Sequence, residues 1–287
     1  MPKREKQVSV ENGEVDARLL NGYIPSPIDE RDYTFTTVYA VEPESEEELP
    51  EEYVTEGNVP VLNQGSNSDC VPHAIATATA YGQYKAEKKY NDMSRGYLYG
   101  NRKLTDTQGE GMIIRQALKN YNHDGNCLNS KFPYRGSYPA MKAKIAEKPE
   151  EYAEEANNHK LINYFRLYSE KEIKKAIMRQ GAVVLGMTIF DNFGTHIKVP
   201  DKNAEKRGGH AMCCIGWNKD GWIIQNSWGT WFGDKGRCYL PYEYPVNEWW
   251  GLTTCITTPE PEKDSFWKRF VGFFKGLINL FKTFFHK

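Results

Sequence analysis

The stretch VLNQGSNSDCVPHAIATA, residues 61–78, joins a polar, turn-rich segment to a run rich in alanine. The alanine-rich run predicts a helix over residues 71–90. Either the serine or the aspartate before Cys70 can cap this helix, and Pro72 falls in the first turn, where its missing N–H costs little. Cys70 is therefore expected at a helix N-terminus, whose partial positive charge favours a thiolate, and it is a candidate nucleophile.

The overall composition indicates a folded globular protein without a general affinity for nucleic acid. The chain has 287 residues, a formal net charge of -1 and 39% hydrophobic residues. This length fits one large domain with extensions as well as it fits two domains. A near-neutral charge gives no global electrostatic attraction to nucleic acid, so we expect no nucleic-acid partner. The N-terminus lacks the apolar run of a signal peptide, and we expect a cytoplasmic or membrane-peripheral protein.

The cysteines are too sparse for a disulfide scaffold in a chain of this length. No CxxC pair and no HExxH motif is present, so we expect no metal site and no cofactor. Apart from Cys70, we interpret the cysteines as buried reduced thiols, namely Cys127, Cys213, Cys214, Cys238 and Cys255.

The order of the predicted elements indicates an α+β protein. A helix fits residues 111–122, where apolar residues keep one face. Ser169 and Glu172 match a capping box that begins a further helix, and Gly181 ends it before a strand over residues 182–189. Helices precede strands along the chain, which favours two segregated halves with a cleft between them.

Two apolar runs, HAMCCIGWN and GWIIQNSW, are separated by the turn NKDG and predict a hairpin. The hairpin would make His210 and Asn226 cross-strand neighbours. A protonated His210 beside Cys70 would stabilise the thiolate, and Asn226 could orient the imidazole ring. The three residue types together indicate nucleophilic catalysis by cysteine.

The separated blocks NQGSNSDC, GGHAMCCIGW and IIQNSWGTWFGDKG resemble the papain-like cysteine proteases, in particular their compact microbial members. The resemblance extends over GEGMIIRQALKNYN, FPY and YLPYEY, roughly residues 49–258. It implies a papain-like fold in which a helical lobe and a β-rich lobe flank the active-site cleft. It also implies a catalytic domain over residues 51–258. Prolines, a glutamate run and the lack of a helical period indicate an extended leader or linker over residues 1–50, and residues 259–287 are read as a linker with a C-terminal helix.

The resemblance implies a role for each matching residue in a cysteine endopeptidase that acts on peptide or protein substrates. Cys70 would attack the peptide carbonyl, and His210 would protonate the leaving amine. Asn226 would orient His210. Gln64 would supply a side-chain donor to the oxyanion. Trp228 would shield the histidine–asparagine hydrogen bond, while the chain near Glu110 and Gly111 would run alongside the substrate.

Some residues depart from the family pattern. Asp69 places a carboxylate next to the thiol, which would raise the cysteine pKa unless the side chain points away. Asn67 stands where secreted relatives carry a disulfide-bonded cysteine, which suits a reducing compartment. The leader lacks a counterpart of the long helical propeptide and could form a short arm that covers the catalytic domain. Two alternatives stay open: an inactive binding relative, and an acyl transferase or deamidase using the same residues.

The C-terminal stretch DSFWKRFVGFFKGLINLFKTFFHK, residues 264–287, predicts a basic amphipathic helix. Aromatic and aliphatic residues recur at helical spacing, with lysines and one arginine on the other side. Such a helix suits the interface of an anionic membrane better than a bilayer span. Packing on the catalytic domain or on a second copy is the alternative.

Overall fold

The computed structural model describes residues 20–39, 48–103, 110–134, 136–191 and 193–254. The predicted C-terminal helix lies outside these residues. Within the described part of the chain, no helix is long and apolar enough to cross a membrane.

The larger of two sheets has seven antiparallel strands in the order β4-β9-β5-β6-β7-β8, with β2 pairing to β6. A separate pair, β1 and β3, runs parallel. The strands are β1 (Tyr23–Ile24), β2 (Tyr53–Val54), β3 (Met112–Ile113), β4 (Leu161–Leu167), β5 (Val183–Phe190), β6 (Lys206–Asn218), β7 (Gly221–Gln225), β8 (Arg237–Leu240) and β9 (Val246–Thr254).

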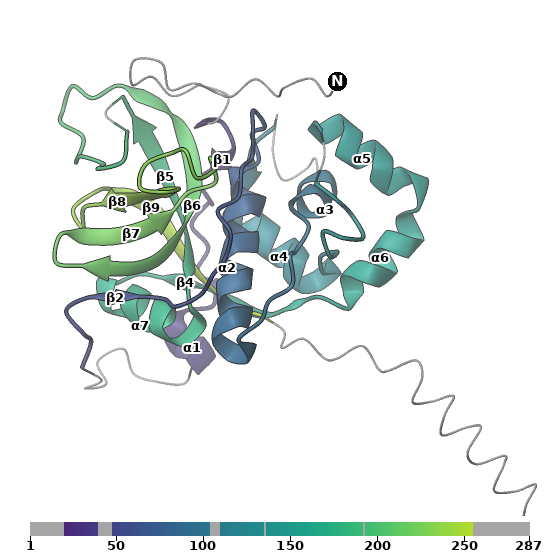
Figure 1. Ribbon diagram of the computed structural model, residues 1–287, viewed down its shortest axis with the longest axis horizontal. Helices are drawn as coiled ribbons and strands as arrows, with labels where there is room; N and C mark the ends of the chain where they lie inside the picture. Colours follow the sequence, from purple (N-terminus) through teal and green to yellow (C-terminus); the bar gives the residue numbers. More distant parts are fainter. Residues whose placement is uncertain (1–19, 40–47, 104–109, 135, 192, 255–287) are drawn as a thin grey trace, which may run out of the picture. The chain divides into compact units, whose positions relative to one another are not determined.

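The helices divide between the two sides of the central helix α2, which packs against β6 and β9 of the large sheet. Figure 1 shows the sheet on one side of α2 and helices α3 to α6 on the other. The helices are α1 (Phe35–Tyr39), α2 (Cys70–Glu87), α3 (Arg95–Gly100), α4 (Ile114–Asp124), α5 (Tyr138–Glu147), α6 (Pro149–Asn157) and α7 (Glu170–Gln180).

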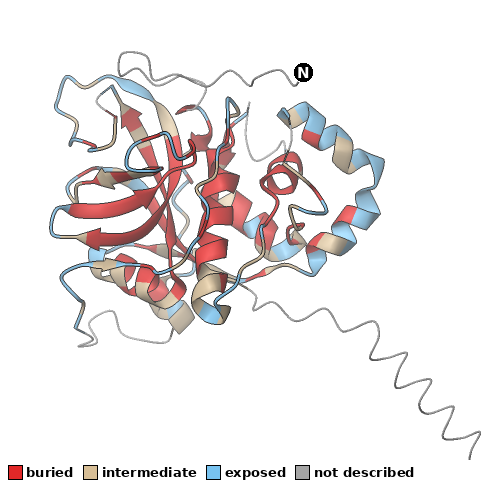
Figure 2. Cartoon of the chain, in the orientation of Figure 1, coloured by how far each residue is buried: buried red, intermediate tan, exposed pale blue. Residues whose placement is uncertain are grey.

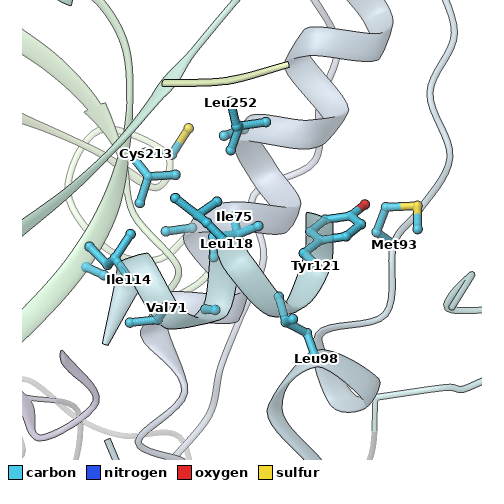
Figure 3. Close-up of a cluster of buried hydrophobic side chains, with 14 of the residues drawn as sticks. Val71, Ile75, Met93, Leu98, Ile114, Leu118, Tyr121, Cys213 and Leu252 are labelled. Carbon is cyan, nitrogen blue, oxygen red and sulfur yellow. The ribbon is translucent and has the colours of Figure 1, made fainter. Parts of the chain in front are cut away.

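Two hydrophobic cores stabilise the fold, one on each face of the sheet. On β5, Val184 enters the core shared with α2, whereas Val183 and Leu185 enter the core shared with α7. This alternation follows the two-residue period of a strand. Figure 2 shows the continuous buried interior along α2 and the sheet. Figure 3 shows side chains of the first core, among them Ile75 of α2 and Leu118 of α4.

The expected α+β architecture with a helical and a β-rich half is confirmed. The capping box of Ser169 and Glu172 is formed at the start of α7, and Gly181 follows its end. The predicted hairpin is also present, with Asn218 paired to Gly221 at its turn. Cys127, Cys213, Cys214 and Cys238 are buried free thiols as expected, Cys70 is buried as well, and Cys255 lies outside the described residues.

Two local expectations were wrong in detail. Residues 111–122 do not form one helix, because Met112 and Ile113 pair with the N-terminal segment before α4 begins at Ile114. Asp69 occupies the N-cap position of α2, but its side chain makes no capping hydrogen bond. The carboxyl group of Asp69 is instead buried beside His73, whose Nδ1 lies 3.4 Å from Oδ1.

The segment before residue 50 contributes to the second core. Phe35 of α1 is fully buried, and its ring contacts that of Phe165 on β4 at 6.0 Å between centroids. This packing fixes the downstream end of the segment on the sheet. Gly22, which precedes it, lies against Cys70.

Candidate active site

Cys70 is the first residue of α2 and is completely buried. The backbone N–H of Ala211 on β6 donates a hydrogen bond to its Sγ at 3.3 Å. Because Ala211 follows His210 directly, this contact brings the histidine-bearing strand to the cysteine-bearing helix. The two halves of the fold therefore meet at the predicted nucleophile.

His210 is held by Asn226, whose side-chain Oδ1 lies 2.8 Å from the histidine Nε2. The same Oδ1 accepts a hydrogen bond from the Ser227 N–H at 2.8 Å, which fixes the amide. An amide oxygen only accepts, so Nε2 carries a proton and Nδ1 of the neutral ring is a free acceptor. Among the described residues Nδ1 has no hydrogen-bond partner. It is therefore available to take the proton of a thiol.

The expected cross-strand proximity of His210 and Asn226 is present as their hydrogen bond. The printed pairing of β6 with β7 ends where Cys213 meets Gln225, one residue before Asn226. His210 lies before Cys213 on β6, so the histidine and asparagine are diagonal neighbours, a separation that side chains of this length can bridge.

Trp228 packs against His210, with ring centroids 4.9 Å apart and an interplanar angle of 32°. The indole is only 1% exposed and also contacts the rings of Phe193 and Phe232. The indole of Trp228 is therefore buried among aromatic rings of the β-rich half and covers His210.

Gln64 is fully buried and is held at both ends of its side-chain amide. Its Nε2 donates to the backbone carbonyl of Asn67 at 2.9 Å, and its Oε1 accepts from the Ser227 hydroxyl at 2.6 Å. A primary amide has two N–H donors, so one remains for a substrate. Ser227 thereby links Gln64 to Asn226. Its role was missed from the sequence, although it follows Asn226 directly.

The N-terminal segment lies directly on Cys70. A Cβ placed on Gly22 would approach the cysteine Sγ to 2.6 Å, so only a glycine fits here. Asn21 forms an isolated parallel bridge with Gly209, one residue before His210. A Cβ on Gly111 would lie 2.8 Å from the Asn21 carbonyl oxygen. The residues expected to run alongside a substrate backbone therefore run alongside the protein's own segment, with Gly111 buried and Glu110 exposed.

The peptide bond of Gly22 is not positioned for attack by the Cys70 thiol. The Gly22 carbonyl oxygen accepts a hydrogen bond from the Met112 N–H at 3.0 Å, as part of the parallel pairing of β1 and β3. That carbonyl accepts from β3, and the described hydrogen bonds of the Gln64 side chain go to Asn67 and Ser227. The segment occupies the site as a ligand would, without offering its peptide bond to Gln64.

Burial sets the protonation of the covered site. The pKa of the Cys70 thiol is raised to about 12, mainly by removal from water and in smaller part by Asp69, against the lowering effect of the Ala211 N–H. Burial lowers the pKa of His210 to about 4. A neutral thiol and a neutral imidazole are therefore favoured at neutral pH, in place of the expected ion pair.

Asp69 is also perturbed by burial, which raises the pKa of its carboxyl group to about 7. At neutral pH the group is near half protonation, and its charge next to Cys70 is weaker than the sequence suggested. The adjacent His73 is kept neutral because burial lowers its pKa to about 3.

A buried cysteine at a helix start, contacted by the N–H that follows an asparagine-bound histidine, has the residue types of a thiol-hydrolase site. The chain belongs to the papain family of cysteine proteases, because residues 50–259 match the sequence model of that family.

Individual relatives agree with this membership. The chain is 28% identical over 209 residues to an uncharacterized peptidase C1-like protein of Acanthamoeba polyphaga mimivirus, covering 65% of this chain and 66% of the relative. It is 38% identical over 72 residues to a cathepsin B-like cysteine proteinase of Ostertagia ostertagi, covering 23% of this chain and 41% of that protein. The chain thus spans less than two thirds of the length of either curated relative.

Among solved structures, the fold is similar to that of xylellain, a cysteine protease from Xylella fastidiosa. The TM-score is 0.71 at 25% sequence identity, and the similarity covers 83% of this chain and 97% of xylellain.

Proposed function

We propose that the protein is a cysteine peptidase that hydrolyses peptide bonds through Cys70, His210 and Asn226. The observation that carries this proposal is the pairing of His210 Nε2 with Asn226, which leaves Nδ1 free on the histidine next to Ala211. The Ala211 N–H in turn touches the cysteine sulfur. In this arrangement His210 would act as the base for the Cys70 thiol, and Asn226 would hold the imidazole in one tautomer.

The proposed reaction has two stages. The Cys70 thiol gives its proton to His210, and the sulfur bonds to the substrate carbonyl carbon. The C–N bond then breaks, and the His210 proton passes to the leaving amine. Water next gives a proton to His210 and adds its oxygen to the acyl carbon, the C–S bond breaks, and the sulfur recovers the proton. The free N–H of Gln64 and the Cys70 backbone N–H would stabilise the oxyanion in both stages.

We further propose that the described state is latent and that residues 20–27 must leave the site before a substrate enters. Support comes from the contact of Gly22 with the Cys70 sulfur and from the neutral protonation that burial imposes on both groups. Opening would hydrate the thiol and imidazole, which lowers the thiol pKa and raises the histidine pKa towards their usual ranges.

The finer features of the proposal are endopeptidase action on peptide or protein substrates, a catalytic domain over residues 51–258 and substrate contacts near Glu110, Gly111 and Trp228. A cytoplasmic location with membrane-surface contact through residues 264–287 also remains a proposal. Asp69 is the one observation that favours an inactive relative. Its carboxyl is uncharged once protonated, and its pKa of about 7 permits this at neutral pH.

The proposed mechanism is tested by labelling with a peptidyl epoxide, followed by mass spectrometry to find the modified cysteine. We expect labelling at Cys70 that is lost in His210→Ala, with Cys127 unlabelled in both proteins. Cys127 is a suitable internal control because it is also buried and burial also raises its pKa to about 12. Labelling of Cys70 that does not depend on His210 would contradict the proposed base.

A further inference from the structure

Residues 20–27, called the covering segment below, place one side chain in a pocket beside Cys70. Tyr23 follows Gly22 and is only 4% exposed. Its ring lies on two glycines of the sheet: a Cβ on Gly186 would approach Tyr23 Cε2 to 2.3 Å, and a Cβ on Gly209 would approach Cδ1 to 3.0 Å. The pocket walls therefore consist of backbone on β5 and β6, and the room for an aromatic ring exists because side chains are absent there.

Glu248 of β9 lies at the end of this pocket and is 3% exposed. Its Oε1 accepts hydrogen bonds from the Tyr23 hydroxyl at 2.7 Å and from the Ser26 N–H at 3.0 Å. Both of these donors belong to the covering segment. If the segment leaves, Oε1 loses both of them at once.

The other oxygen of Glu248 is held by the body of the protein. Oε2 accepts from Arg166 Nη1 at 2.8 Å and from the Trp250 indole N–H at 2.7 Å. The Arg166 guanidinium also lies over the Trp250 ring, 5.1 Å from its centroid. The charge of Glu248 is thus already compensated by Arg166, while one acceptor oxygen faces the pocket.

We propose that Glu248 determines specificity by selecting a tyrosine side chain in the substrate, within two residues of the scissile bond. The inference rests on the proposed peptidase function. The Gly186–Gly209 walls accept a flat ring, and Oε1 needs a donor at the distance of the Tyr23 hydroxyl. A phenylalanine would fill the same space but leave that buried oxygen without its donor.

The ion pair between Arg166 and Glu248 favours a neutral substrate side chain over a cationic one. A lysine or arginine would have to shed its hydration to meet a carboxylate whose charge Arg166 already balances. It would also bring a second cation close to Arg166. A tyrosine hydroxyl meets the same oxygen with a far smaller loss of hydration, so tyrosine is preferred over both phenylalanine and arginine.

The test uses the full chain with the segment displaced by Gly22→Leu, because any side chain at this position collides with Cys70 and Ser68. Gly194→Leu is the matched control, since a Cβ there meets no atom within 4 Å. Both proteins are given peptides that differ only in one residue, tyrosine, phenylalanine or arginine, and cleavage sites are mapped by mass spectrometry. We expect kcat/KM for tyrosine to exceed that for phenylalanine by about 10- to 100-fold in Gly22→Leu.

Two further variants separate the hydrogen bond from general packing. Glu248→Gln keeps the shape and replaces a charged acceptor with a neutral one, so the tyrosine preference should fall about tenfold. Gly186→Ala leaves Glu248 intact but narrows the ring pocket, so tyrosine and phenylalanine peptides should both lose kcat/KM relative to peptides with small residues. Equal use of tyrosine and phenylalanine by Gly22→Leu would overturn the inference while leaving the peptidase function standing.

A binding measurement makes the inference independent of turnover. In the double variant Gly22→Leu/Cys70→Ala, fluorescence anisotropy should show a Kd at least about tenfold lower for the tyrosine peptide than for its phenylalanine match. Equal Kd values would overturn the specificity assignment. Discriminating Kd values without any hydrolysis by the Cys70-bearing protein would instead overturn the proposed function and retain the assignment.

Discussion

The hydroxyl group of Tyr23 should control how often the covering segment leaves Cys70. Tyr23→Phe removes the 2.7 Å hydrogen bond to the buried Glu248 carboxylate but keeps the ring between the glycines. A hydrogen bond to a charged group contributes about 1.5–3 kcal/mol, which corresponds to about 10- to 150-fold in an equilibrium constant. Because this bond exists only while the segment is docked, the substitution should raise the open population by that factor.

The assay is the rate of Cys70 alkylation by iodoacetamide, at reagent concentrations where the rate is first order in reagent. Under this condition labelling is slow relative to opening and closing, and the rate follows the open population. Tyr239→Phe is the control, because it deletes a hydroxyl–carboxylate hydrogen bond of 3.0 Å to Asp234 on the surface. Its rate should match that of the unmodified protein. An unchanged rate in Tyr23→Phe would refute the reasoning that this bond holds the segment on the site.

Four further predictions address the reaction, the buried acid and the tail. Gln64→Ala should lower kcat by about 100- to 1000-fold with little change in circular dichroism, because it deletes one oxyanion donor; a change confined to KM would contradict that role. Asn226→Ala should lower kcat/KM by about tenfold or more and shift its pH profile, since the His210 tautomer is no longer fixed; an unchanged profile would argue for a structural role only. Asp69→Asn should raise the urea midpoint of unfolding more at pH 8 than at pH 4.5. The pKa of Asp69 is about 7 in the folded protein and lower in the unfolded chain, so the folded protein binds this proton more tightly. The stability that the protonated carboxyl contributes is therefore lost as the pH rises to 7, and the asparagine does not lose it. Deleting residues 264–287 should leave peptide hydrolysis intact and end sedimentation with anionic vesicles, and vesicle binding that survives the deletion would place the membrane contact elsewhere.

The local elements could be predicted because each depended on neighbouring residues. Gly181 ends α7, the Ser169–Glu172 box begins it, and the Asn218–Gly221 turn forms the hairpin. The register of that hairpin could not be predicted, because a two-residue shift keeps the same side chains on the same face. The direction of the Asp69 side chain also could not be predicted, because it depends on tertiary packing around α2 and not on the neighbouring sequence.

The part of the site that could not be predicted is the one assembled from distant segments. Tyr23 and Glu248 are separated by 225 positions, and neither stands in a recognisable motif. Glu248 in the run VNEWW reads as one polar residue of a mostly buried strand, and its function as an acceptor appears only when Arg166, Trp250 and Tyr23 surround it. Tyr23 likewise fell within the predicted leader over residues 1–50. The signal that could have raised the question was the absence of a side chain at Gly22, Gly186 and Gly209, but glycines in isolation do not say what approaches them.

Under the proposed function, the same contacts would store the Cys70 thiol in a buried, neutral form. In the proposed latent state Cys70 and His210 are buried and uncharged, and the covering segment donates two hydrogen bonds to the one Glu248 oxygen that its departure would expose. Opening therefore has two linked effects: it hydrates the catalytic pair, which permits charge separation, and it leaves an unsatisfied acceptor beside the thiol. A tyrosine-bearing substrate restores that hydrogen bond and a peptide without a donor does not. Latency and substrate choice would consequently depend on the same carboxylate, so Glu248→Gln should loosen the covering segment and relax specificity together. Faster Cys70 alkylation in Glu248→Gln with unchanged tyrosine preference would show that the two properties have separate origins.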